Sequence, residues 1–101
     1  MEVVITDQAL ARLEESLHFY IYELEMPVEK AMEIKNNLLN RAKGLVDYPF
    51  KGQLELYLTK LNLGHRRLIE GNFKIVYRIE KEKIYVVDFF DGRDNPDKMK
   101  G

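Results

Sequence analysis

The chain has 101 residues, of which 46% are hydrophobic and 33% charged, and its formal net charge is −1. These values are typical of one globular domain and exclude a disordered chain, so we expect a single domain over residues 1–101. The lack of cysteine excludes disulfides, thiolate-bound zinc and a thiol nucleophile. No apolar run approaches the length of a membrane span, and the N-terminus does not resemble a signal peptide, so we expect a cytoplasmic protein.

A strand and two helices are expected in the first half of the chain. EVVI at residues 2–5 predicts a strand, and either side chain of Thr6-Asp7 can cap a helix that ends near Glu25. Pro27 is suited to the first position of a second helix, which extends to about Val46. Apolar residues recur at spacings of three and four in both segments, and the short link predicts an antiparallel helical hairpin.

The middle of the chain gives weaker signals. Proline and glycine in DYPFKG, residues 47–52, predict a loop. The stretch 53–63 is compatible with an extended segment or a helical turn, and we favour the extended form. After residue 90, DGRDNPDKMKG predicts a polar turn and tail, in which Arg93 either closes the sheet edge or points over the sheet.

Three antiparallel strands are expected at residues 65–70, 73–80 and 83–90. Gly71-Asn72 suits a two-residue hairpin turn, and Lys81-Glu82 is the natural second turn. Counting outward from these turns gives the pairing of the strands. It places Arg67 opposite Val76, Val76 opposite Val87, Lys74 opposite Phe89 and His65 opposite Arg78.

Alternation along the strands then divides the side chains between two faces of the sheet. The face predicted to be core carries Leu68, Phe73, Ile75, Tyr77, Ile79, Ile84, Val86 and Phe90. The other face carries His65, Arg67, Lys74, Arg78, Tyr85, Val87 and Phe89. The same count puts Asp88 among the core residues, where we expect Arg66 or the Tyr77 hydroxyl to pair with it.

The predicted fold is α+β. An N-terminal strand, a helical hairpin and an antiparallel three-strand meander make a two-layer sandwich, with the helices on the apolar face of the sheet. The opposite face is expected to stay open and accessible.

Positive charge collects on this second face. Residues 1–59 hold 6 Lys and Arg against 10 Asp and Glu, whereas residues 60–101 hold 10 against 7. Such a face suits a nucleic-acid backbone, with Tyr85 and Phe89 available for stacking on bases, or an acidic protein segment; the plain alternative is a solvated surface. For RNA cleavage His65 is a candidate base and Arg67 and Lys74 are candidate stabilisers, but no acid is evident. The two histidines are too isolated for a metal site, and no cofactor motif is present.

The segment RRLIEGNFKIVYRIEKEKIYVVDFFDGRDNP, residues 66–96, resembles the C-terminal part of the RelE/ParE toxin superfamily of type II toxin–antitoxin modules. The strand–helix–helix order before it fits the same family. The resemblance implies a toxin that stops growth until a cognate antitoxin binds it in a hetero-oligomer. It also implies that the antitoxin docks along the helical hairpin and the sheet, with an acidic and apolar segment.

Two activities are implied, one for each branch of the superfamily. Members similar to RelE are ribosome-dependent endoribonucleases that cut mRNA. Their catalytic positions fall here on His65, Arg67, Lys74, Arg93 and, in place of a tyrosine, Met99.

Members similar to ParE instead poison DNA gyrase without a nuclease site. The segments GNFKIVYRI and FFDGRDNP resemble this plasmid-stabilisation branch more closely, and we favour it. The alternatives are the mRNA endoribonuclease and a non-toxic module that only binds its antitoxin. On any of these readings the target- or antitoxin-binding surface consists of His65, Arg67, Lys74, Arg78, Tyr85, Phe89 and Arg93.

Overall fold

The computed structural model describes residues 1–101 and is built on one five-stranded sheet of order β1-β5-β4-β3-β2. The strands are β1 (Glu2–Ile5), β2 (Gln53–Leu54), β3 (Arg66–Glu70), β4 (Phe73–Glu80) and β5 (Lys83–Asp91). β1 runs parallel to β5, and the other neighbouring strands are antiparallel. The predicted α+β fold, with a meander after two helices, is confirmed.

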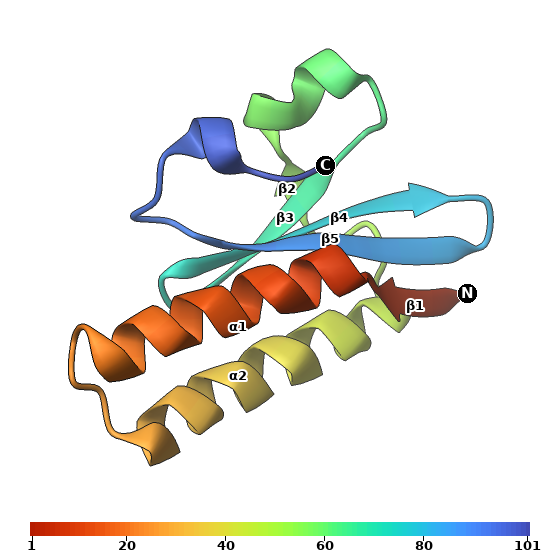
Figure 1. Cartoon of the computed structure of the whole chain (residues 1–101). Coiled ribbons are helices and arrows are strands. Elements are labelled where there is room, and N and C mark those ends of the chain that lie inside the picture. The colour runs from red at the N-terminus through yellow and green to blue at the C-terminus, as the bar shows by residue number, and fades with distance from the viewer.

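Helices α1 (Asp7–Tyr22) and α2 (Val28–Lys43) form the expected antiparallel hairpin on one face of the sheet (Figure 1). The Thr6 side chain caps α1 by accepting a hydrogen bond from the backbone N–H of Ala9, at 3.2 Å. α1 ends at Tyr22, earlier than predicted. Glu25 lies in the left-handed region at a φ of 55°, which a continuing helix does not permit. A short 3₁₀ helix, η1 (Gly44–Val46), prolongs α2.

The main core lies between this hairpin and the sheet. Its 15 buried residues are Ala9, Leu13, Leu17, Tyr20, Ala31, Leu38, Ala42, Leu45, Leu68, Phe73, Ile75, Tyr77, Ile84, Val86 and Phe89. Both predicted turns are present, and each begins with a residue of positive φ: Gly71 at 58° and Lys81 at 57°. Neither helix is long and apolar enough to cross a membrane.

A β-bulge changes the predicted register of β4 and β5. The pairing follows the prediction from Glu80 to Tyr77, but the next residue, Val76, lies opposite Asp88 and not Val87. One extra residue in β5 reverses the faces of everything beyond it. Phe89 therefore faces the helices, Phe90 faces the other way, and both assignments made from the sequence are wrong.

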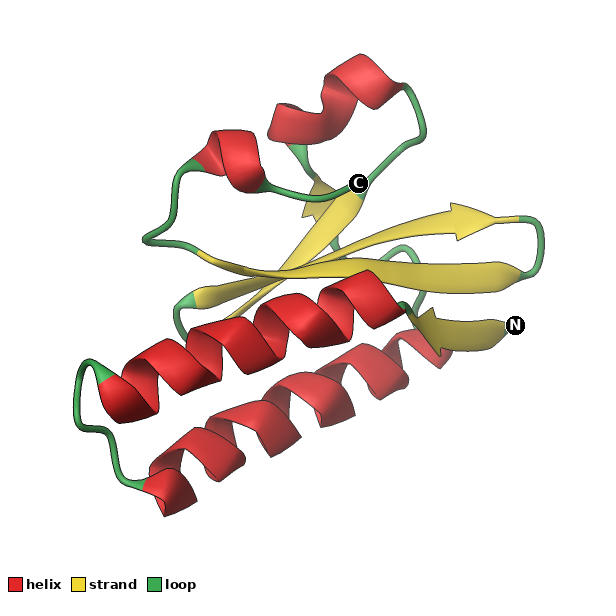
Figure 2. Cartoon of the chain, viewed as in Figure 1, coloured by secondary structure: helices red, strands yellow, loops and turns green.

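The second face of the sheet is covered, so the prediction that it stays open is wrong. Two 3₁₀ helices, η2 (Leu56–Leu61) and η3 (Pro96–Lys98), lie on this side, opposite α1 and α2 (Figure 2). A second, smaller core forms beneath them from Leu58, Val76, Val87, Phe90 and Met99. These apolar side chains would otherwise be exposed to water, which is the physical reason for the cover.

The stretch 53–63 is extended only at β2. From Leu56 it forms η2, which the Glu55 side chain caps by accepting from the backbone N–H of Tyr57. Asn62 ends the helix in a left-handed conformation, at a φ of 55°. The extended prediction was wrong here because tertiary contacts of Glu55 and Leu58 fix a helical turn.

Candidate functional site

The central basic residues of the second face are paired with a buried carboxylate. Lys74 Nζ lies 3.0 Å from Glu55 Oε1, and Arg67 Nε lies 3.8 Å from the same oxygen. The Glu55 side chain is 1% exposed, and its other oxygen accepts the Tyr57 N–H at 3.1 Å. Lys74 Nζ also lies 5.4 Å from the centre of the Tyr57 ring. We call Glu55, Arg67, Lys74 and Tyr57 the Glu55 cluster; it joins η2 to the sheet.

Arg67 also forms hydrogen bonds with the neighbouring strand β2. Its guanidinium donates to the Leu54 carbonyl at 2.5 Å and to the Gln53 side-chain oxygen at 3.2 Å. Its side chain keeps 22% exposure, and that of Lys74 keeps 21%. Arg67 and Lys74 are therefore both partly accessible to solvent while they pair with the buried Glu55 carboxylate.

Two residues predicted for the binding surface are buried. His65 is 3% exposed, and its Nε2 lies 3.1 Å from the Gly101 carbonyl oxygen, while its Nδ1 has no hydrogen-bond partner. Phe89 is fully buried in the main core because of the bulge. Neither ring is presented on the second face for stacking or for proton transfer to a bound molecule.

Arg78 and Tyr85 are opposite each other on β4 and β5. The Arg78 guanidinium carbon lies 4.9 Å from the centre of the Tyr85 ring, and its Nη1 lies 2.5 Å from Glu80. Both side chains are partly exposed. They form a cation–aromatic pair that an approaching partner could contact.

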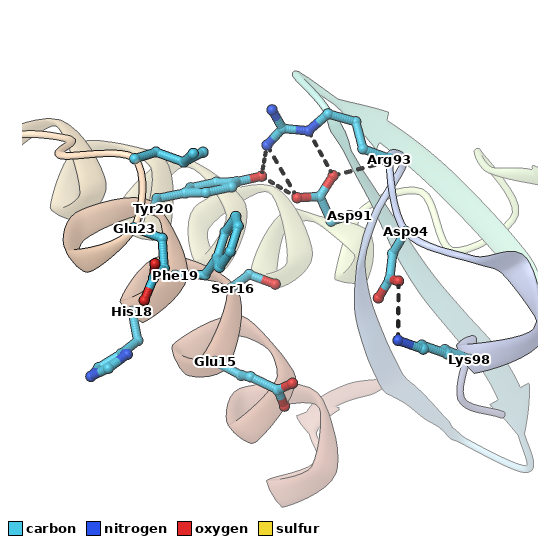
Figure 3. A pocket seen from close by; sticks show the side chains of 11 residues that line it. Glu15, Ser16, His18, Phe19, Tyr20, Glu23, Asp91, Arg93, Asp94 and Lys98 are labelled. Carbon is cyan, nitrogen blue, oxygen red and sulfur yellow. Dashed lines mark hydrogen bonds and ion pairs between the residues drawn. The ribbon is translucent and has the colours of Figure 1, made fainter.

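Arg93 turns toward the helices and not over the basic face. Its guanidinium donates to Asp91 and to the Tyr20 hydroxyl, and the Tyr20 hydroxyl donates to Asp91 (Figure 3). Burial, together with Asp91, raises the pKa of Tyr20 to about 12. Burial would raise the pKa of Asp91, but hydrogen bonds from Arg93 and Tyr20 outweigh it and hold that pKa below its ordinary value. Arg93 and Asp91 therefore form an ion pair, and the Tyr20 hydroxyl that is hydrogen-bonded to it stays neutral.

This group lies in the wall of a cleft of about 760 Å³ between α1 and the end of β5 (Figure 3). The cleft is lined by Glu15, Ser16, His18, Phe19, Tyr20, Glu23, Leu24, Asp91, Arg93, Asp94 and Lys98. Carboxylates outnumber cations in this lining, so the cleft does not favour a phosphate.

A smaller hollow of about 280 Å³ lies at the turn between β3 and β4. Lys74 and Arg93 both line it, together with Ile69 and Gly71, whereas Arg67 and His65 do not. The structure thus brings Lys74 near Arg67 at Glu55 and near Arg93 at this hollow. It does not gather all four candidate residues around one point.

Asp88 has a different partner from either one predicted. It is fully buried on the second face, where it accepts the Lys100 N–H at 2.8 Å and pairs with Arg12 Nε at 3.7 Å. Burial raises the pKa of Asp88, against the opposing effects of Lys100 and Arg12. Its contacts hold the C-terminal segment against the sheet.

The predicted partners of Asp88 serve the loop before β2. Arg66 donates to the Gly52 carbonyl at 2.7 Å, and the Tyr77 hydroxyl accepts the Gly52 N–H at 2.9 Å. A side chain at Gly52 would come within 2.7 Å of that hydroxyl. Both predicted pairings are wrong because the bulge turns Asp88 away from the face that Tyr77 occupies.

Three residues important to these sites were not identified from the sequence: Glu55, Tyr20 and Asp91. Glu55 is the only acidic residue of the stretch 53–63 and lies between leucines, which is a signal for a buried, paired carboxylate. Tyr20 belongs to the apolar stripe of α1 and gives no such signal. Asp91 follows the last apolar residues of β5, where it resembles an ordinary turn residue.

The chemistry available to this arrangement is limited. No three His, Cys, Asp or Glu side chains gather where they could hold a metal ion. Met99, at the position of the RelE-like tyrosine, is 8% exposed and fills the second core. The exposed parts of Arg67, Lys74, Arg78 and Tyr85 suit binding better than proton transfer.

Comparison with protein families gives one informative result. The family model described as "ParE toxin of type II toxin-antitoxin system, parDE" matches residues 3–96, which include both helices, β2 to β5 and all of β1 except Glu2. Comparison with curated proteins gives no match.

Proposed function

The chain belongs to the ParE toxin family of type II toxin–antitoxin systems, and we propose that it stops growth by poisoning DNA gyrase in the cytoplasm. Membership of this family implies a cognate antitoxin as partner. We further propose that the partly exposed side chains of Arg67, Lys74, Arg78 and Tyr85 and the exposed side chain of Arg93 contribute to protein binding. No catalytic role is needed for any of them under this proposal.

The separation of the nuclease positions is the observation that supports gyrase over mRNA as the target. A ribonuclease site needs a base, cations at the phosphate and an acid within reach of one substrate. Here His65 is buried, Met99 is core, and the Arg93 guanidinium pairs with Asp91 on the helix side. A protein that acts by binding does not require these groups to converge.

A ribosome-dependent endoribonuclease is the second candidate. One feature favours it: the hollow at the β3–β4 turn is lined by both Lys74 and Arg93. The two cations would meet a phosphate there only if Lys74 left Glu55 and Arg93 left Asp91, and the lining includes no group suited to act as acid or base.

Induction of the toxin in bacterial cells tests the proposal. We expect DNA breaks and a DNA-damage response while translation, measured by amino-acid incorporation, is initially intact. With purified DNA gyrase, the toxin should raise the amount of trapped cleavage complex. Co-expression of the cognate antitoxin is the control in cells and should abolish the DNA breaks and the DNA-damage response.

Two other outcomes would contradict gyrase poisoning. Early arrest of translation, with mRNA cut in the codon register, would identify the endoribonuclease. Normal growth with folded toxin, verified by circular dichroism, would leave a module that only binds its antitoxin.

A further inference from the structure

The short segment before η2 surrounds the two central cations of the second face. Arg67 Nη1 donates to the Leu54 carbonyl, and Arg67 Nη2 donates to the Gln53 side chain. Arg67 Nε and Lys74 Nζ lie 3.8 and 3.0 Å from the same oxygen of Glu55. The segment thus takes the positions around both cations that an external anion would need.

The Glu55 carboxylate occupies the place of a bound anion. Its side chain is 1% exposed, although it belongs to the connection between β2 and η2 and not to the sheet itself. A guanidinium and an ammonium group on one surface are the groups with which proteins bind phosphate as well as carboxylate oxygens. An internal carboxylate between them excludes an external anion for as long as η2 stays in place.

Few contacts attach η2 to the sheet. Leu58 is its one buried side chain. Leu56, Tyr57 and Leu61 are 75%, 55% and 44% exposed. The second core beneath η2 has five residues, against fifteen in the main core, and a segment with few buried apolar contacts opens at a lower free energy than the rest of a fold. Apart from Leu58, η2 is therefore held mainly by the ion pairs of Glu55.

The groups beside Glu55 indicate which anion would replace it. Lys74 and Arg78 lie on the same side of β4, and Arg67 lies beside them on β3. The Tyr85 ring is next to Arg78, with its centre 4.9 Å from the guanidinium carbon. Several cations beside an aromatic ring suit the phosphates and unpaired bases of a single-stranded nucleic acid. A carboxylate of a partner protein would use the cations but not the ring.

We propose that η2 masks a binding site for single-stranded nucleic acid, in which Arg67 and Lys74 bind phosphates and Glu55 is the internal anion that keeps the site closed. Arg78 and Tyr85 extend the site along the sheet. In the closed form the toxin binds nucleic acid weakly, and displacement of η2 frees both cations together. The inference goes beyond the proposed function and does not depend on which target the toxin attacks.

A charge variant of the whole toxin tests the internal anion. E55Q removes the charge of Glu55 but keeps an oxygen for the Tyr57 N–H. E14Q is the matched control, since it removes one carboxylate from the ion pair of Glu14 with Lys35 on the helical side. Binding of a fluorescein-labelled single-stranded DNA oligonucleotide is measured by fluorescence anisotropy at several salt concentrations.

At about 50 mM salt, E55Q should bind the oligonucleotide at least about tenfold more tightly than wild type. The slope of log K against log salt concentration should steepen by about 0.7 for each phosphate that a freed cation gains. E14Q should stay close to wild type. In E55Q/K74Q most of the gain should disappear, because one of the two freed cations is removed.

A second pair of variants tests the movement of η2 without changing any charge. L58A removes the buried anchor of η2, and L61A removes the same residue type from its exposed side. L58A should also bind the oligonucleotide at least about tenfold more tightly, since loss of a buried leucine favours the open form by at least that factor. L61A should resemble wild type. Circular dichroism verifies the fold of every variant, and E55Q decides alone if L58A does not fold.

Each other outcome contradicts part of the proposal. Equal affinities of wild type, E55Q and E14Q would overturn the masked site, and equal gains in E55Q and E14Q would attribute binding to net charge alone. A gain in E55Q but not in folded L58A would show that η2 is not the mask. An undiminished gain in E55Q/K74Q would place the nucleic acid elsewhere. If E55Q gained affinity for a polyglutamate peptide and not for the oligonucleotide, the site would take a protein carboxylate and the assignment of phosphate would be wrong.

Discussion

At the scale of residues, the second face of the sheet depends on Glu55. A buried carboxylate is costly unless cations and hydrogen-bond donors compensate it, and here Lys74, Arg67 and the Tyr57 N–H do so together. Removing one cation leaves the carboxylate buried with too little compensation. A variant of Lys74 therefore changes the stability of η2 as well as the surface charge.

We predict a large coupling free energy between Lys74 and Glu55. Lys74→Ala should lower the free energy of unfolding by about 2–3 kcal/mol, because the Glu55 charge is left without its closest partner. In a Glu55→Gln background the same change should cost at least about 1 kcal/mol less. Urea denaturation of the four proteins in this cycle provides the measurement.

The surface pair Arg78–Glu80 is the control for that cycle. The Glu80 side chain is 56% exposed, so solvent screens the pair and its coupling should be below about 0.5 kcal/mol. Equal couplings for the two pairs would show that burial of Glu55 is not what gives Lys74 its importance.

At the scale of elements, the bulge in β5 decides which side chains meet. It allows Phe89 to join the main core and Phe90, one residue later, to join the second core. It also turns Asp88 onto the second face, where Lys100 of the C-terminal segment can reach it. The bulge thus gives the second face an apolar side chain that the C-terminal segment covers, Phe90, and a carboxylate that holds this segment in place, Asp88.

Truncation of Phe89 tests this register. Phe89→Ala should lower the free energy of unfolding by about 3–5 kcal/mol, as for a fully buried phenylalanine, in chemical denaturation experiments. Tyr85→Ala is the comparison, since an unbulged pairing would put both rings on the second face. Tyr85 is only partly buried, so its loss should be less than half as large. Similar losses for the two variants would contradict the bulged register.

The elements that sequence reasoning found and missed differ in what fixes them. Local signals fix the Thr6 cap and both hairpin turns, and these were predicted correctly. Pro27, predicted at the first position of the second helix, is instead the N-cap before α2. The bulge has no local signal, because VVDFF buries apolar residues in either register. Likewise, η2 depends on the contact of Glu55 with Lys74, nineteen positions away, which no short window contains.

For the candidate site, the sequence identified the basic residues but not their partners. Charge and alternation correctly put Arg67, Lys74 and Arg78 on one face of the sheet. Alternation says nothing about a carboxylate arriving from outside the meander, so neutralisation by Glu55 was missed. Arg93 follows β5 in a turn, where period-two alternation no longer determines the direction of a side chain.

At the scale of the whole molecule, the sheet separates two layers of unequal strength. The helical side has a core of 15 buried residues, whereas the side of η2 and η3 has 5. Local opening costs less where fewer apolar contacts are broken. The layer of η2 and η3 should therefore open before the layer that carries the helices.

Hydrogen exchange can measure this difference directly. Backbone amides of η2 and of residues 98–100 should exchange through openings of lower free energy than those of β4 and α1. Met99→Ala, which removes one of the five side chains of the second core, should raise exchange in η2 while α2 keeps its protection. Leu38→Ala is the matched change in the main core and should raise exchange on both sides of the sheet, because that core holds the whole fold. If Met99→Ala raised exchange in α2 as much as in η2, the two layers would unfold as one unit. A layer that opens separately would let substitutions in η2 loosen the cover of the second face without unfolding the helices.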